Sequence, residues 1–157
     1  YCTRAQSVNT ITSRRINSAT IEYKGQKVEF YTCHMNLPTN QEEKMADNIQ
    51  TILKRSQTDN LKILMGDFNT DAINSPEDYK MILSQGLYDT YTMAEEKDSG
   101  ITVGGNIDGW SKSKEEKRID YILSNKEIKV KSSKVIFNGE NHPVVSDHYG
   151  LEVILDL

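Results

Sequence analysis

The sequence Leu61-Lys62-Ile63-Leu64-Met65-Gly66-Asp67-Phe68-Asn69 is a strand-like segment that ends in polar residues. Residues 61–65 form a nearly continuous apolar run, which is typical of a central strand buried on both faces. The carboxylate and the amide that follow would lie at the carboxyl end of that strand. Glycine, aspartate and asparagine are also common in turns, so this segment alone predicts a turn as readily as a functional site.

Three further blocks favour the functional interpretation, because each lies at the end of, or inside, another apolar run. They are Cys33-His34-Met35-Asn36 upstream, and Arg118-Ile119-Asp120-Tyr121-Ile122 and Ser146-Asp147-His148 downstream. Together the four blocks supply the carboxylates, imidazoles and amide needed for the attack of water on a phosphoester beside a divalent cation. The ordered set, rather than any one block, predicts this chemistry.

The side chains of these blocks have distinct predicted tasks. Asp67 can hold or deprotonate a water molecule or ligate Mg²⁺ or Mn²⁺, and Asn69 can bind a phosphate oxygen. Asp147 can ligate the metal, and His148 can protonate the leaving oxygen or stabilise phosphoryl charge; the alternative for this pair is a solvated loop. Asp120 lies inside an apolar strand, where a carboxylate needs a partner, and we expect that partner to be His148.

The first block and the lone tryptophan each permit two interpretations. Adjacent residues of a strand point to opposite faces, which argues against a catalytic pair of Cys33 and His34 and predicts that Cys33 packs in the core. A lone histidine is more often a core residue, but the other blocks favour a place in the site for His34. Trp110 either stacks on a sugar ring or a base, or packs against the protein.

Apolar periodicity predicts the secondary structure around these blocks. Strands are expected over residues 16–23, 27–35, 61–65, 118–123, 128–137 and 149–156, with a short extended piece over 87–93. Helices are expected over 41–55, after a capping box that begins at Thr39, and over 76–84, where Pro76 starts the first turn. Residues 95–117 are expected to form a long functional loop.

Length and composition limit the function classes. A chain of 157 residues predicts a single domain over residues 1–157 with a substantial core. The formal net charge of −4 favours a small phosphorylated substrate over a nucleic acid, whose binding usually requires a basic surface. No apolar run is long enough to cross a bilayer, and no signal peptide is recognisable. Cys2 and Cys33 are interpreted as free thiols, so we expect a cytoplasmic protein that does not bind membranes.

The four blocks together resemble those of the endonuclease/exonuclease/phosphatase superfamily, which includes DNase I-like nucleases, inositol polyphosphate phosphatases and neutral sphingomyelinases. The resemblance covers residues 16–157. Ile107-Asp108-Gly109-Trp110, followed by Lys117-Arg118-Ile119-Asp120, is more similar to a bacterial subgroup that includes maltose 6'-phosphate phosphatase. The resemblance implies an α+β fold, a DNase I-like α/β sandwich in which two sheets lie face to face with helices outside.

The resemblance also implies a role for each matching residue. Asp67 would orient or activate the attacking water, and Asp120 would orient the imidazole that acts on the scissile phosphate. The implied catalytic residues are His34, Asp67, Asn69, Asp120 and His148. The implied substrate-binding residues are Asn69 and Trp110, and the implied ligands of Mg²⁺ or Mn²⁺ are Asp147 and Asp67.

One part of the family pattern has no counterpart in this sequence: an upstream strand with an asparagine, followed by the glutamate that is the main metal ligand. The chain therefore resembles the carboxyl-terminal part of the family domain, with one sheet, its covering helices and part of the site. We expect the longer protein that contains this chain to be a metal-dependent phosphatase of a phosphorylated sugar or another small molecule, and the isolated chain to be inactive. The alternatives are a Mg²⁺-dependent endo- or exonuclease and a non-catalytic interaction module on the same fold.

A half sandwich would leave apolar surface uncovered. The helices expected over 41–55 and 76–84 can cover only one face of a single sheet, and soluble monomers rarely expose a large apolar face. Two copies could bury this surface against each other. We therefore expect self-association through the uncovered sheet face.

Overall fold

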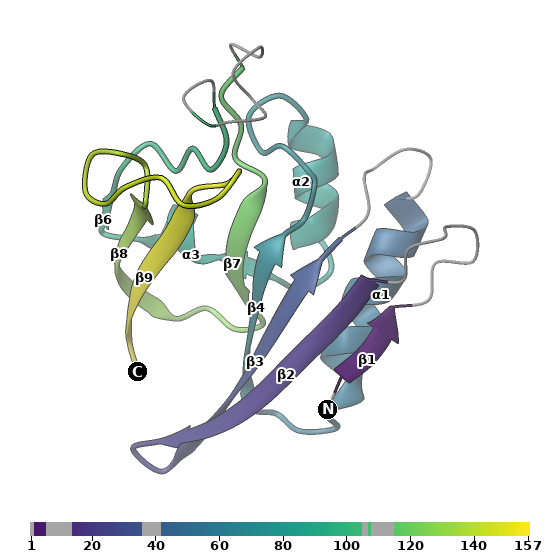
Figure 1. Cartoon of the computed structure of the whole chain (residues 1–157). Coiled ribbons are helices and arrows are strands. Elements are labelled where there is room, and N and C mark those ends of the chain that lie inside the picture. Colours follow the sequence, from purple (N-terminus) through teal and green to yellow (C-terminus); the bar gives the residue numbers. More distant parts are fainter. Residues whose placement is uncertain (1, 6–13, 36–41, 105–106, 108–114) are drawn as a thin grey trace.

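The computed structural model of the chain describes residues 2–5, 14–35, 42–104, 107 and 115–157 (Figure 1). Its largest element is a six-stranded sheet in the order β1-β2-β3-β4-β7-β5. These strands span Cys2–Ala5, Arg14–Tyr23, Gln26–His34, Leu61–Asp67, Asp120–Ser124 and Tyr88–Asp89, respectively. β3 and β4 are parallel, and the other neighbouring pairs are antiparallel. The predicted central strand, β4, therefore lies inside the sheet as expected.

Two helices cover one face of this sheet (Figure 1). Ile49 of α1 and Ile82 of α2 are completely buried in a core cluster with Leu64 of β4 and Tyr121 of β7. The apolar spacing that predicted both helices is thus the spacing that buries them. The described helices are α1 (Glu42–Arg55), α2 (Pro76–Leu83) and α3 (Thr90–Met93). Among them, none combines the length and the apolar composition that a membrane span requires.

The last strands form a second sheet, which corrects the expectation of a single sheet. Its order is β6-β8-β9, with strands Glu96–Lys97, Lys129–Ile136 and Gly150–Asp156. β8 pairs with β9 on one edge and with β6 on the other. These strands therefore form a sheet of their own and do not add to the six-stranded sheet. The apolar alternation over 149–156 predicts a strand with one buried face, but it carries no information about which sheet that strand joins. The expected α+β class is confirmed.

Two local expectations also differ from the structure. Residues 90–93 form α3 instead of continuing the extended piece, because the Asp89 side chain accepts a hydrogen bond from the Tyr91 N–H at 2.9 Å and caps the helix. The long loop expected over 95–117 begins with β6, and its described part includes the fully buried Thr102 and Val103. The described part around Thr102 and Val103 is therefore packed into the protein. The expected capping box at Thr39 lies outside the described residues.

The sheet face opposite the helices is covered in part. Ile63 on this face is almost fully buried, and Ile122 of β7 lines a small cavity together with Leu151 and Val153 of β9. Toward β2 the face is open, and Ile21 is 50% exposed. The second sheet therefore lies against the β4–β7 side, and the exposed apolar surface predicted for this face lies along β2. Self-association through it stays a prediction.

Candidate active site

The ends of three neighbouring strands bring three of the predicted site residues side by side. In the parallel pair β3–β4, His34 lies opposite Asp67. In the antiparallel pair β4–β7, Asp67 lies opposite Asp120. Cross-strand partners project from the same face of a sheet, so these three side chains form a row across the ends of the three strands.

Asp67 occupies the middle of this row. Its Oδ2 lies 3.2 Å from Nε2 of His34, whose side chain is 53% exposed. Burial raises the pKa of the Asp67 carboxyl, and the nearby Asp120 adds to the rise. The N–H of Asn69 and the imidazoles of His34 and His148 oppose it. The result is a carboxylate that binds a proton more readily than an exposed aspartate does.

The end of β4 requires Gly66, and Asn69 follows in the bend just after the strand. Gly66 has a φ of 135°, and a Cβ at this position would overlap the carbonyl oxygen of Cys33. Asn69 has a φ of 51°; its N–H donates to Oδ1 of Asp67 at 2.7 Å, and its Nδ2 donates to the Met35 carbonyl at 2.8 Å. Asn69 thus positions Asp67. A second hydrogen on Nδ2 is the donor for the predicted phosphate contact, which stays a prediction.

Asp120 and His148 form the hydrogen-bonded pair that the sequence predicts, with Oδ2 of Asp120 2.8 Å from Nδ1 of His148. A carboxylate only accepts, so Nδ1 carries the hydrogen and Nε2 is the second functional position of the ring. This hydrogen bond raises the pKa of His148, burial opposes it, and Asp67 and Asp147 add to the rise. The ring is therefore charged over a wider pH range than a free histidine.

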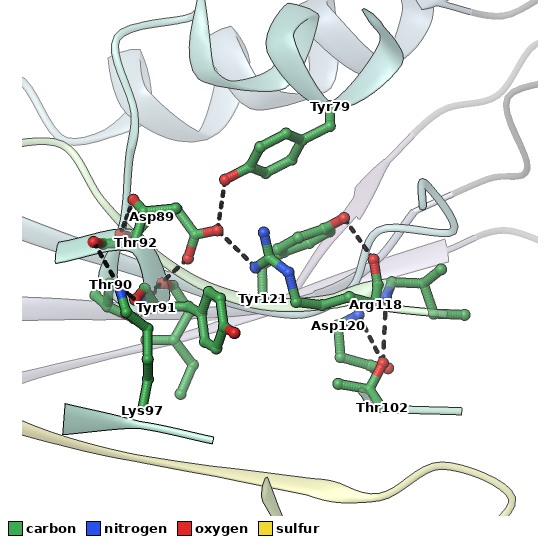
Figure 2. A network of polar contacts seen from close by, with 12 residues as sticks. Tyr79, Asp89, Thr90, Tyr91, Thr92, Lys97, Thr102, Arg118, Asp120 and Tyr121 are labelled. Atoms are coloured by element: carbon green, nitrogen blue, oxygen red, sulfur yellow. Dashed lines mark hydrogen bonds and ion pairs between the residues drawn. The ribbon is translucent and has the colours of Figure 1, made fainter. Parts of the chain in front are cut away.

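An enclosed polar cluster holds the start of β7 beside this pair (Figure 2). Nη1 of Arg118 lies 2.6 Å from Oδ2 of Asp89, and the same oxygen accepts the hydroxyl of Tyr79 at 2.6 Å. The guanidinium also lies over the rings of Tyr79, Tyr91 and Tyr121. Burial opposes the charge of Arg118, but Asp89 and Tyr79 outweigh it and raise its pKa. No local sequence pattern predicts this cluster, because its members come from two separate stretches of the chain, residues 79–91 and 118–121.

The remaining predicted residues have different surroundings. Asp147 is exposed, and its Oδ1 accepts the Ser146 hydroxyl at 3.1 Å. Trp110 lies outside the described residues. Cys33 is buried, which raises the pKa of its thiol to about 12 and confirms that it packs in the core.

The described residues do not form a complete metal site. No group of three or more His, Cys, Asp and Glu side chains in the described part of the chain could hold a metal ion. The Asp67 oxygens face Asn69 and His34, and Asp120 faces His148. Asp147, beside His148 and exposed to solvent, is the predicted ligand with the most accessible carboxylate. One such carboxylate is too small an oxygen shell for Mg²⁺.

Comparisons with known proteins assign the chain to a family and relate its fold to solved structures. The sequence model of the endonuclease/exonuclease/phosphatase family matches residues 7–148. A solved structure of an endonuclease/exonuclease/phosphatase family protein from Leptotrichia buccalis C-1013-b is similar with a TM-score of 0.90 and 60% identity, over 100% of this chain and 61% of that chain. This chain thus spans less than two thirds of that relative.

Two more distant structures share the fold. A mannosyl-6-phosphatase from Bacteroides thetaiotaomicron VPI-5482 has a TM-score of 0.79 and 22% identity, over 100% of this chain and 65% of that chain. A humanized D. rerio TDP2 has a TM-score of 0.65 and 16% identity, over 100% of this chain and 66% of that chain. A search of curated protein sequences gave no match.

Proposed function

The chain belongs to the endonuclease/exonuclease/phosphatase family, and from this premise we propose that it forms part of the active site of a metal-dependent phosphatase. The family includes phosphatases and nucleases, and its members are usually hydrolases. The expected DNase I-like fold is confirmed by the family match and the full-chain structural similarity. The observation that carries the proposal is the row of His34, Asp67 and Asp120, with His148 hydrogen-bonded at its end.

In the proposed reaction Asp67 accepts a proton from the attacking water. Its raised pKa suits this task, because a base works best when its pKa lies nearer the working pH. Asn69 keeps the carboxylate in place through its N–H. The positive charge of His148, favoured by Asp120, stabilises the developing charge on the phosphoryl group or protonates the leaving oxygen.

His34 is the exposed member of the row, and we assign it to the phosphate itself. Nε2 of His34 lies near Asp67, so a phosphate held there would be close to the base that activates water. Its exposure also means that a ligand can reach it without a rearrangement of the core. Trp110 keeps its proposed role in stacking on the substrate.

The proposed cofactor is Mg²⁺ or Mn²⁺, which would supply positive charge for the phosphate oxygens. We assign Asp147, and in the longer protein also Asp67, to its coordination. Because the described residues are too few to complete the site, the other ligands must come from outside them. We therefore propose that the metal-dependent activity belongs to the longer protein and that the 157-residue chain alone is inactive.

The proposed substrate is a phosphorylated sugar or another small phosphate ester. The net charge of −4 supports this choice over a nuclease, and a mannosyl-6-phosphatase among the similar structures agrees with it. We also propose a cytoplasmic location, since the buried Cys33 is a free thiol.

The decisive experiment measures phosphate release by the full-length protein from hexose 6-phosphates, with DNA hydrolysis measured in parallel. We expect release that requires Mg²⁺ or Mn²⁺ and stops with a chelator. His34→Ala should reduce it strongly, whereas the control His142→Ala, in an exposed loop, should not. DNA hydrolysis without phosphatase activity would establish the nuclease alternative, and the absence of both would favour an interaction module.

A further inference from the structure

Thr102 lies outside the four sequence blocks, yet it contacts the chain at both ends of the Asp120–His148 pair. It is completely buried in the segment between β6 and β7. Its Oγ1 accepts hydrogen bonds from the N–H of Ile119 at 3.2 Å and from the N–H of Asp120 at 3.3 Å (Figure 2). Its carbonyl accepts the N–H of Tyr149, the residue after His148, at 2.8 Å.

These contacts join two separate sheets. Asp120 is the first residue of β7 in the large sheet, and His148 precedes β9 of the small sheet. The side chains of the pair meet through one hydrogen bond of 2.8 Å, which is sensitive to any shift between the sheets. Thr102 fixes the backbone on each side of that bond, and its own N–H is held by the Lys117 carbonyl at 2.9 Å.

We propose that Thr102 is a positioning residue that sets the separation of Asp120 and His148 and thereby keeps Nε2 of the imidazole directed at the substrate. This inference rests on the proposed phosphatase function for its catalytic consequence. The hydroxyl acts as an acceptor for two consecutive N–H groups, a task that serine retains and that valine, of nearly the same shape, cannot perform.

The test compares Thr102→Val and Thr102→Ser in the full-length protein. We expect Thr102→Val to lower kcat by about 10²-fold with little change in KM, because a shift of about 1 Å in a catalytic group has this effect. Thr102→Ser should retain most of the activity.

The matched control is Thr90→Val. Thr90 is also buried, and its hydroxyl donates to another β7 backbone atom, the Ile122 carbonyl, at 2.6 Å. If loss of a buried hydroxyl bound to β7 is enough to lower kcat, both valine variants will be equally impaired, and the proposal is overturned.

A second readout is independent of activity. The ¹⁵N chemical shifts of the neutral His148 ring show which nitrogen carries the hydrogen. We expect the Nδ1–H form in the unsubstituted protein and in Thr102→Ser, and a mixture of the Nδ1–H and Nε2–H forms in Thr102→Val. An unchanged ring in Thr102→Val overturns the positioning role even if the enzyme is a phosphatase. A changed ring in a protein without phosphatase activity supports positioning and refutes only the proposed function.

If Thr102→Val does not fold, the same two measurements on Thr102→Ala decide the matter, since alanine also lacks the hydroxyl and introduces no new atoms. An alanine variant with the kcat and the His148 ring of the parent protein would overturn the proposal.

Discussion

Two carboxylate–cation pairs lie almost side by side at the start of β7, and they differ in how far the protein shields them from solvent. The Asp89 and Arg118 side chains are 1% and 8% exposed, and tyrosines occupy the space around them. The Asp120 and His148 side chains are 15% and 23% exposed, beside the half-exposed His34. The enclosed charges fix the strand, whereas the charges with one solvent-exposed side are available for chemistry.

The largest change is expected when the partly exposed groups are removed, because we assign the catalysis to them. We expect Asp67→Ala and His148→Ala each to lower the phosphatase rate of the full-length protein by roughly 10²–10⁴-fold, the usual range for a positioned acid or base. The folded state should persist in both variants, which circular dichroism can verify. A near-parental rate in Asp67→Ala would remove its role as the base.

The enclosed pair should show the opposite response. Asp89→Ala leaves the Arg118 charge buried without its carboxylate, and we expect the free energy of unfolding to fall by about 3–5 kcal/mol. Urea denaturation measures the change. Glu77→Ala is the matched control, because it removes the exposed ion pair with Lys80 and should cost less than about 1 kcal/mol.

A second enclosed carboxylate, Glu29, should stabilise the fold in a pH-dependent way. Burial opposes its charge, but hydrogen bonds from Ser56, Thr58, Asn60 and Tyr31 lower its pKa from 4.5 to about 2. A lowered pKa contributes stability above the unfolded-state value of 4.5, and this contribution is lost as the pH falls toward 2.

The free energy of unfolding should fall by about 3 kcal/mol as the pH is lowered from 4.5 to about 2, and this fall should be absent in Glu29→Gln. Denaturant unfolding curves at several acidic pH values measure it. Equal acid sensitivity of the parent chain and Glu29→Gln would contradict the assignment.

The Asp120–His148 pair should show the opposite pH dependence, with stability lost as the pH rises. Asp120 raises the pKa of His148, so the charged ring stabilises the fold below the unfolded-state pKa of 6.5, and this contribution is lost as the pH rises through the raised value. We expect Asp120→Asn to lower the pKa of His148, as followed by NMR titration of the ring. An unchanged pKa would mean that the hydrogen bond does not persist in solution.

The exposed apolar surface along β2 should cause weak self-association. Ile21 and Tyr23 are 50% and 48% exposed on the face opposite the helices, so we expect the 157-residue chain to self-associate there. Light scattering should show less association for Ile21→Lys than for Ile154→Lys, a control at a similarly exposed residue of β9. A monodisperse monomer at high concentration would refute the prediction.

Local patterns predicted the contact of Asp120 with His148 better than they predicted the sheets. Asp120 could be paired with His148 from the sequence, because a carboxylate in an apolar strand requires a partner. The second sheet could not be predicted, since alternation identifies a buried face and not the strand that pairs beside it. Thr102 carries no local signal at all: its task depends on Asp120 and Tyr149, which approach it only in the folded chain.

The site residues are drawn from widely separated parts of the chain, and this has a consequence for the order of folding. His34 and His148 are assembled beside Asp67 and Asp120 only when β3, β4 and β7 are paired and the second sheet is docked. Contacts of such large sequence separation form slowly, because long loops must close first. The local hairpin of β2 and β3 should therefore form early, and the Asp120–His148 hydrogen bond should mark the completion of folding.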